Sequence, residues 1–453
     1  MKKTLLLLVL ALSLVLSGCS LVVKDPEVDA RQVIVEINGQ QVDKQSFNAT
    51  YNTLLSQELQ LQQMYKMYGM QPPAIDYEGL KVKAKDAAIR SEIIRQQAEK
   101  LNMQELTEEE KAKLAEDTES TYKNTLEQLK NYYLKDTKLE GEALDKELAN
   151  LAEQTGNTKE SIEGSLKTDL VTGKLRSETV KDVAVSEEET RAEYDAKVEK
   201  DKTAYAEKPD SYGSDVNGGK SPYFAPEGYR YVKQVLVKFL AEDETEIDRI
   251  QGEKTTADTE LQKARDAKTA NETAMAREGI TEDEKKALED KVPELDAAIT
   301  AAQEKADKLA QDLLAARNKG YEAILPKAQE VYNRAAAKED FDALVKEYNE
   351  DKGMPEKGYA VREGFASFDE AFVKPAMALA AIGDVAEPSQ GLYGYYIVQY
   401  AADITPGPVD YDSVKETVHK ELLDKKQADT WEAAITGWTE AADIKEHMER
   451  LSN

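Results

Sequence analysis

The chain has 453 residues, and at roughly 100–200 residues per domain this length predicts more than one domain. Asp and Glu number 88 against 60 Lys and Arg, a net charge of -28 that argues against nucleic acid as a partner, because phosphates are bound by basic side chains. One cysteine excludes a disulfide framework, and two histidines leave little room for a histidine-based metal site or a Ser-His-Asp enzyme. The sequence carries neither a P-loop nor a dinucleotide-binding glycine pattern, so no cofactor is expected.

The first residues have the pattern of an export signal. Lys2 and Lys3 precede an apolar run over 5–15, which is too short for a transmembrane helix of about 20 residues. Leu16-Ser17-Gly18-Cys19 follows and resembles a bacterial lipobox, which implies cleavage after residue 18 and acylation of Cys19. Two acyl chains would give stable anchoring. We therefore expect a signal peptide over 1–18 and a lipidated tether over 19–32, with an uncut signal anchor as the alternative.

The segment 33–207 is predicted to form a mostly helical domain. Residues 33–37 alternate like a β-strand, and Asn38-Gly39 predicts a turn after them. Helix starts follow at residues whose side chains can accept a hydrogen bond from the first helical turn, and the last two form capping boxes with a glutamate three residues later. These N-caps are Asp43, Thr107 and Ser186.

The first of these helices is expected to end near Gly69, and its last part is rich in methionine and tyrosine. The residues are Met64, Tyr65, Met67, Tyr68 and Met70. Methionine adapts to varied partners and is common at promiscuous binding surfaces. Ordinary core packing is the alternative explanation.

The segment 208–228 is rich in Pro, Gly, Ser and Asp and is predicted to be a linker. A strand is predicted from Tyr229 to Phe239, because its apolar side chains alternate between two faces. A long block without aromatic residues follows, in which apolar residues recur at alternating spacings of four and three. This heptad pattern predicts a coiled-coil helical hairpin over 243–317, with Pro293 kinking or restarting its second helix.

After the hairpin, two short helices, a glycine-rich turn region and a final strand over 395–400 are expected. Residues 404–453 should then form C-terminal helices. Trp431 and Trp438 lie in this last segment, and buried tryptophans there would dock it back on an earlier domain.

Several motifs resemble parvulin-type peptidyl-prolyl isomerases. The strand from Tyr231 to Val237 resembles the first parvulin strand. The segments that begin at Phe341, Tyr348, Phe372, Gly383 and Gly394 resemble later family motifs in the same order. The strand, turn and helix near the N-terminus and the Ser186 helix resemble the chaperone part of the PrsA and SurA foldases, and the lipobox favours the PrsA type.

The resemblance implies an α+β fold. A mostly helical chaperone domain would be followed by a parvulin-like α/β domain over 229–403, with the hairpin as an insertion and the C-terminal helices docking back. It also assigns a site, in which the two family histidines fall on Gln234 and Tyr396, the Cys-or-Asp position on Asp351, and a threonine near Gly391. The proline pocket would be formed by Phe368, Phe372 and Met377.

The function implied is a foldase or holdase for newly secreted chains, lipid-anchored on the outer face of the cytoplasmic membrane of a Gram-positive type of cell. Because both histidines are replaced, we expect X-Pro peptide binding with isomerase activity that is weak or absent. The alternative is a non-catalytic lipoprotein that binds one specific partner. Three alternative roles remain open for the hairpin: an inert insertion, a spacer or a homodimer contact.

Overall fold

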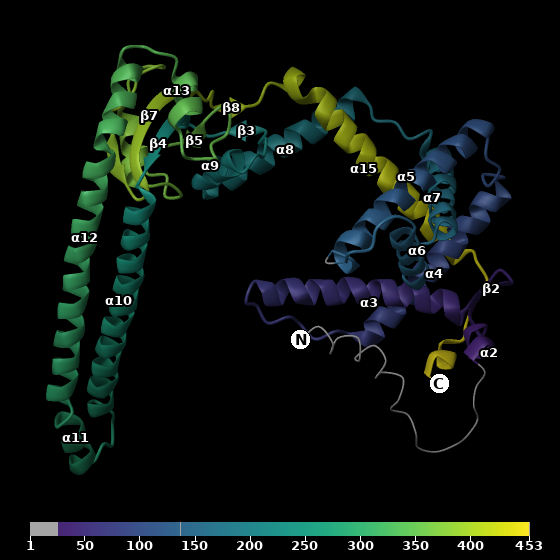
Figure 1. Ribbon diagram of the computed structural model, residues 1–453, viewed down its shortest axis with the longest axis horizontal. Helices are drawn as coiled ribbons and strands as arrows, with labels where there is room; N and C mark the ends of the chain where they lie inside the picture. Colours follow the sequence, from purple (N-terminus) through teal and green to yellow (C-terminus); the bar gives the residue numbers. More distant parts are fainter. Residues whose placement is uncertain (1–25, 136, 453) are drawn as a thin grey trace. The chain divides into compact units, whose positions relative to one another are not determined.

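The protein is described here from a computed structural model, which describes residues 26–135 and 137–452. Two compact units are formed, Met1–Val185 with Lys420–Asn453 (unit 1) and Ser186–His419 (unit 2). Cys19, the predicted signal peptide and the first part of the tether lie outside the described residues. Within the described ranges, no helix is both long enough and apolar enough to cross a bilayer. The predicted mixture of a helical N-terminal region and small sheets is confirmed (Figure 1).

Unit 1 begins with helices whose starts match the predicted caps. The Asp43 side chain accepts a hydrogen bond from the backbone N–H of Ser46, and Thr107 forms a full capping box with Glu110. Gly69 follows the first long helix with a φ of 69°, as expected for a helix C-terminus. The helices are α2 (Pro26–Ala30), α3 (Lys44–Met67), α4 (Tyr77–Lys100), α5 (Glu108–Tyr133), α6 (Gly141–Gln154) and α7 (Lys159–Val180).

The C-terminal segment completes unit 1. The long helix α15 (Tyr411–Glu440) brings Trp431 into a cluster with Ala98 and Leu175, which confirms the predicted docking. The prediction of helices alone over 404–453 is wrong, because this segment also contains two short strands, at Gly407–Pro408 and at Ile444–Glu446. Strand β9 (Ile444–Glu446) pairs antiparallel with β1 (Val33–Ile37), whose other neighbour is β2 (Gln40–Asp43), and the short 3₁₀ helix η2 (Met448–Ser452) follows.

Part of the segment expected to be a tether is folded. Helix α2 lies within it, and Asp29 of this helix forms an ion pair with Lys44 at 2.9 Å. Lys44 is buried, and its ammonium also donates to the backbone oxygen of Arg450. A buried charge is stable only with partners of this kind, so these contacts hold α2 against the rest of unit 1.

Unit 2 is built around an antiparallel sheet in the order β5-β4-β7-β6. The strands are β4 (Arg230–Lys238), β5 (Tyr359–Val361), β6 (Ser389–Gly391) and β7 (Gly394–Asp403). The alternation predicted for the two long strands is confirmed, since Val235 and Ile397 pack on one face and Leu236 and Val398 on the other. Helix α13 (Phe341–Tyr348) belongs to the first face and helix α14 (Glu370–Ala378) to the second.

The helical hairpin lies between β4 and α13 in the chain. Its arms are α10 (Ala241–Met275) and α12 (Val292–Ala336), which run side by side and are joined through α11 (Glu282–Glu289) (Figure 1). The ion pairs Lys305–Glu260 and Lys268–Asp296 cross between the arms in antiparallel register. The buried hairpin residues Ala306 and Leu313 are seven residues apart, as the predicted heptad pattern requires.

The two prolines of the second arm behave differently. Pro293 lies in the first turn of α12, where its missing N–H costs nothing, so it restarts the helix as predicted. Pro326 lies inside α12, which continues to Ala336. The expectation of a separate helix after residue 317 is therefore wrong, because packing of Ile324, Ala328 and Val331 against the sheet carries the helix through the proline.

The segment predicted as a linker contains regular structure. Helix α9 (Asp210–Asn217) follows α8 (Glu187–Glu207), and β3 (Phe224–Ala225) pairs with β8 (Gly407–Pro408). Tyr205, Tyr212 and Tyr229 form a chain of edge-to-face rings there. These aromatic contacts order a stretch whose composition alone is typical of a loop.

Candidate functional site

A cavity of about 650 Å³ opens on the face of the sheet that carries α14. Strands β4, β5 and β7, the segment before β5 and the start of α14 all contribute to its wall. The lining side chains that matter below are Gln234, Leu236, Asp351, Tyr359, Phe368, Phe372 and Tyr396. The cavity is therefore present and open where the sequence predicted a proline pocket.

Aromatic rings form most of its apolar wall. The Phe368 ring lies 4.7 Å from that of Tyr359 and 5.4 Å from that of Phe372, between centroids. Phe372 in turn meets Tyr396 at 5.9 Å with the ring planes 73° apart. Such tilted and edge-to-face contacts are favourable for aromatic pairs, so they fix the rings around the cavity.

The Asp351 carboxylate is the polar centre of the site. Its Oδ2 accepts hydrogen bonds from Gln234 Nε2 and from the Tyr359 hydroxyl, each at 2.7 Å. Its Oδ1 accepts from the backbone N–H of Gly353 at 2.9 Å. Because three donors satisfy this one carboxylate, Asp351 is held in a single orientation below the aromatic wall.

Gln234 is buried, with 5% of its surface exposed. An ionised carboxylate can only accept hydrogen bonds, so the amide must present its N–H₂ to Asp351. Gln234 Oε1 is consequently buried without a hydrogen-bond partner among the described residues. An unpaired buried acceptor costs about 1–3 kcal/mol, and strained features of this kind gather at functional sites.

Tyr396 occupies its position because residue 391 is glycine. A Cβ atom at Gly391 would lie 1.9 Å from Cε2 of the Tyr396 ring and 2.7 Å from Asp369 Oδ2. A threonine near this position, as the resemblance implies for the family, would therefore collide with a tyrosine at 396. The two departures from the family pattern fit each other sterically.

Two tyrosines of the cavity keep their protons. Burial, and then the hydrogen bond to Asp351, raises the pKa of the Tyr359 phenol above its ordinary value. Burial, followed by the nearby Asp369 carboxylate, raises the pKa of Tyr396 in the same way. Both phenols are therefore neutral at physiological pH, and Tyr359 acts as a hydrogen-bond donor.

The structure brings together most of the predicted site residues. Asp351 and Gln234 are hydrogen-bonded, while Tyr396 lines the same cavity without a hydrogen bond to Asp351 among those described. Phe368 and Phe372 line the cavity, whereas Met377 packs against the adjoining core and is not part of the lining. The roles of all these residues stay predictions.

Sequence reasoning missed Tyr359. Its hydroxyl supplies a hydrogen bond to Asp351, and its ring packs on Phe368. The short strand β5 places it there by pairing with β4, where Tyr359 lies opposite Val232. The three-residue strand gave too short a pattern to predict this pairing.

The lining of this cavity contains no histidine. The histidines lie elsewhere, with His419 Nδ1 3.1 Å from the Thr190 hydroxyl and the backbone N–H of His447 donating to Ile34. Across the described ranges, no group of three or more His, Cys, Asp or Glu side chains is placed to hold a metal ion. What remains is an apolar cup above a fixed carboxylate.

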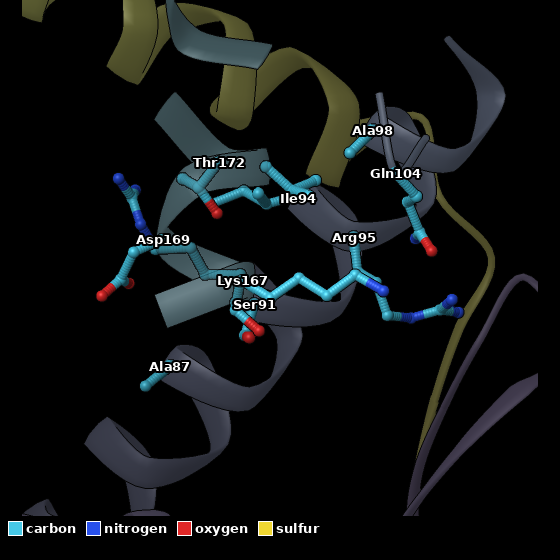
Figure 2. Close-up of a pocket in the computed structure, with 12 residues that line it drawn as sticks. Ala87, Ser91, Ile94, Arg95, Ala98, Gln104, Lys167, Asp169 and Thr172 are labelled. Atoms are coloured by element: carbon cyan, nitrogen blue, oxygen red, sulfur yellow. The ribbon is translucent and has the colours of Figure 1, made fainter. Parts of the chain in front are cut away.

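A second cavity, of about 600 Å³, lies in unit 1 between α4 and α7. Figure 2 shows Ala87, Ile94 and Ala98 from α4 along one side and Thr172 from α7 facing them. Polar side chains also line it, among them Ser91 and Lys167. Arg90, Arg95 and Asp169 also belong to its lining.

Two domain families match this chain. Residues 1–176 match the SurA-like N-terminal domain, and residues 311–402 match the PPIC-type PPIase domain. The second match begins within α12 and runs through β7. It therefore contains the cavity residues from Asp351 to Tyr396, while β4 with Gln234 precedes it and joins through the sheet.

Individual relatives agree with these matches. The foldase protein PrsA of Clostridium botulinum (strain 657 / Type Ba4) is 23% identical over 443 residues, which are 97% of this chain and 95% of that protein. Foldase protein PrsA 3 of Bacillus anthracis is 33% identical over 132 residues, 28% of this chain and 45% of that protein.

Solved structures of similar proteins include PrsA from Bacillus subtilis, with 16% identity, a TM-score of 0.21 and coverage of 73% of this chain and 82% of that one. A SurA-like chaperone structure from Campylobacter jejuni has 12% identity, a TM-score of 0.25 and coverage of 92% and 100%. At these TM-scores the family assignment depends on the sequence matches. The chain is similar to the foldase protein PrsA over nearly its whole length, and it contains regions that match a SurA-like N-terminal domain and a PPIC-type PPIase domain.

Proposed function

We propose that this protein is an extracytoplasmic foldase with holdase activity that grips X-Pro segments of newly secreted chains and has isomerase activity that is weak or absent. A lipid on Cys19 would anchor it to the outer face of the cytoplasmic membrane. The printed names of the relatives support the foldase part of this proposal. The lipobox pattern supports the anchor.

The observation that carries the proposal is the aromatic cup above Asp351. Rotation about an X-Pro bond must cross a barrier of about 18–20 kcal/mol, and the twisted amide has less charge separation than the planar one. An apolar cup favours the twisted form, and polar groups beneath it tune the local field. Phe368 and Phe372 line this cup, which supports the proposal that the grip on proline is retained.

The residues at the two family histidine positions would change the polar groups that tune the field beneath the cup. An imidazole pair can share and move protons around the central acid, whereas an amide and a neutral phenol cannot do so near pH 7. Gln234 and Tyr359 hold Asp351 by hydrogen bonds alone. The site would therefore bind proline segments while doing little to lower the rotational barrier.

The test is proline-limited refolding of a model protein together with suppression of aggregation for several unrelated unfolded proteins. We expect refolding accelerated far less than by an intact parvulin, and aggregation reduced for most clients. Turnover equal to that of an intact parvulin would contradict the isomerase part. A null result with all clients, together with tight binding of one partner, would favour the non-catalytic lipoprotein.

The anchor has a separate test. Cys19→Ala should move the protein from the membrane fraction to the soluble extracytoplasmic fraction and abolish incorporation of a labelled fatty acid. Aggregation suppression by the purified protein should be unchanged, because Cys19 precedes α2, the first helix that the structure describes. Membrane retention of the unacylated variant would support the uncut signal anchor instead.

A further inference from the structure

The far half of α3 and the segment that follows it form an exposed, weakly packed arm, defined here as residues 59–75. From residue 48 to residue 79 no side chain is buried, although α3 is one continuous helix (Figure 1). Met67 is 75% exposed, Tyr68 70% and Met70 55%. The returning segment is held by a hydrogen bond from Gln62 Nε2 to the backbone oxygen of Pro73 at 2.9 Å.

The arm differs from the rest of the molecule in charge. One third of all residues are charged, yet Lys66 is the single charged residue between Glu58 and Asp76. Three of the nine methionines fall within this stretch, together with several exposed glutamines. An exposed surface with many apolar side chains and a single charge, on a highly charged protein, marks an interaction site.

We propose that the arm docks extended segments of unfolded polypeptide that are apolar and carry lysine or arginine in preference to aspartate or glutamate. This inference rests on the proposed holdase function and names where and what it binds. Methionine thioethers adapt to varied apolar side chains. The exposed amides of Gln60, Gln63 and Gln71 can donate to and accept from the unpaired backbone of such a segment.

Charge complementarity selects this occupant. The arm repels neither sign strongly, while the rest of the molecule, with a net charge of -28, attracts basic segments and repels acidic ones. A bilayer is a poorer fit, because helices that lie in membrane interfaces carry many Lys or Arg and Trp or Phe side chains. The arm has one lysine and neither of those aromatic residues. A second copy of this acidic chain would also bring like charges together.

The experiment compares the full mature chain with a triple variant, Met67→Gln, Tyr68→Gln and Met70→Gln. The substituted side chains are exposed, and glutamine keeps the helix propensity of methionine. The probe is a labelled 15-residue peptide of Leu, Tyr, Ser and Gly residues with two lysines, and its partner has two glutamates in their place. We expect the variant to bind the lysine peptide at least fivefold more weakly, and wild type to prefer lysine over glutamate by at least threefold at low salt.

Matched controls separate the arm from other surfaces. Tyr132→Gln, Tyr133→Gln and Leu139→Gln remove exposed apolar groups elsewhere in unit 1, and Ser91→Arg blocks the cavity of Figure 2. Each control should bind the peptide within twofold of wild type. The inference is overturned if a control, and not the arm variant, loses affinity, or if both peptides bind equally at low salt.

Three further readouts tell the remaining outcomes apart. Arm-dependent sedimentation with phosphatidylglycerol vesicles, with peptide affinity intact, would assign the arm to a membrane. A dimer that only the arm variant loses would assign it to a second copy. Aggregation suppression by wild type that the arm variant fully retains would sink this inference and leave the proposed function standing. Absence of any client effect in wild type would instead sink both.

Discussion

At the residue scale, the site combines an aromatic cavity wall with one carboxylate that is held by hydrogen bonds. Asp351 accepts these hydrogen bonds from Gln234, Tyr359 and the Gly353 N–H. The cavity wall depends on ring packing that does not involve the replaced positions, apart from Tyr396. We therefore predict that proline binding and barrier lowering separate, because different atoms would supply them.

The fit of Tyr396 against Gly391 gives a prediction for stability. Gly391→Ala should lower the free energy of unfolding by about 1–3 kcal/mol, as overpacking does, since the new Cβ would meet the Tyr396 ring. In a chain that also carries Tyr396→His, Gly391→Ala should lower the free energy of unfolding much less. Urea denaturation of wild type, the two single variants and the double variant would measure this coupling. Equal costs in both backgrounds would contradict the packing argument.

The buried tyrosines determine how the free energy of unfolding falls at alkaline pH. Burial raises the pKa of Tyr212 to about 12, and burial raises the pKa of Tyr359 and Tyr396 as well. An unfolded phenol ionises near pH 10, so the stability these groups contribute is complete below that pH and is lost as the pH rises above it.

Urea denaturation of the full chain from pH 8 to pH 11.5 measures this effect. The contribution of these phenols to the free energy of unfolding should be constant up to about pH 9 and then fall. Tyr359→Phe should have a shallower fall, because phenylalanine does not ionise. A slope identical to wild type would place Tyr359 in solvent, contrary to the structure.

At the element scale, local sequence patterns predicted where helices start and which face of a strand each side chain occupies. The capping residues Asp43, Thr107 and Ser186 start helices where expected, and the alternation in β4 and β7 assigns their two faces correctly. The passage of α12 through Pro326 was not predictable, because a proline inside a helix is tolerated only through tertiary packing. The pairings of β5 and β9 were missed for a related reason, since three-residue strands take their order from distant partners.

The hairpin has a base that belongs to the core and a far part that does not. Ile247, Ile250 and Leu313 pack in the cluster on the sheet, whereas Ala257, Leu261 and Ala306 form a separate cluster further out. Removing residues 257–308 with a short turn in their place should leave the melting temperature nearly unchanged. Removing 243–317 should destabilise unit 2 severely, since truncating each large buried side chain costs about 2–5 kcal/mol.

Thermal unfolding of the two deletions, with the mass of each in solution, tests this division. A collapse of the fold after the shorter deletion would show that the outer hairpin is structural. Loss of a dimer after the shorter deletion would assign the outer hairpin to self-association, and an unchanged mass would leave the insertion and spacer roles.

At the scale of the whole molecule, unit 1 combines an N-terminal segment of the chain with a C-terminal one. Strand β9 pairs with β1, and the backbone N–H of His447 donates to the oxygen of Ile34 at 2.8 Å. Trp438 packs with the apolar residues of β1 and α4. Truncation after Glu440 should therefore expose the edge of β1 and lower the melting temperature of unit 1 by several degrees or more.

Hydrogen exchange would measure that loss locally. The amides of Val35 and Ile37 should exchange much faster in the truncated chain, while the amides of β4 and β7 should keep their protection. Unchanged protection of β1 would show that the C-terminal strand does not stabilise it.

The central claim is that the aromatic cup binds proline segments while the rebuilt polar centre does little to speed their isomerisation. The most direct measurement is NMR of an X-Pro peptide with the protein, which reports binding and cis–trans exchange in one sample. We predict binding that Phe372→Ala and the half-buried Phe368→Ala each weaken about tenfold, with exchange far slower than an intact parvulin produces. Exchange as fast as that of an intact parvulin, or binding untouched by both substitutions in folded protein, would contradict the account.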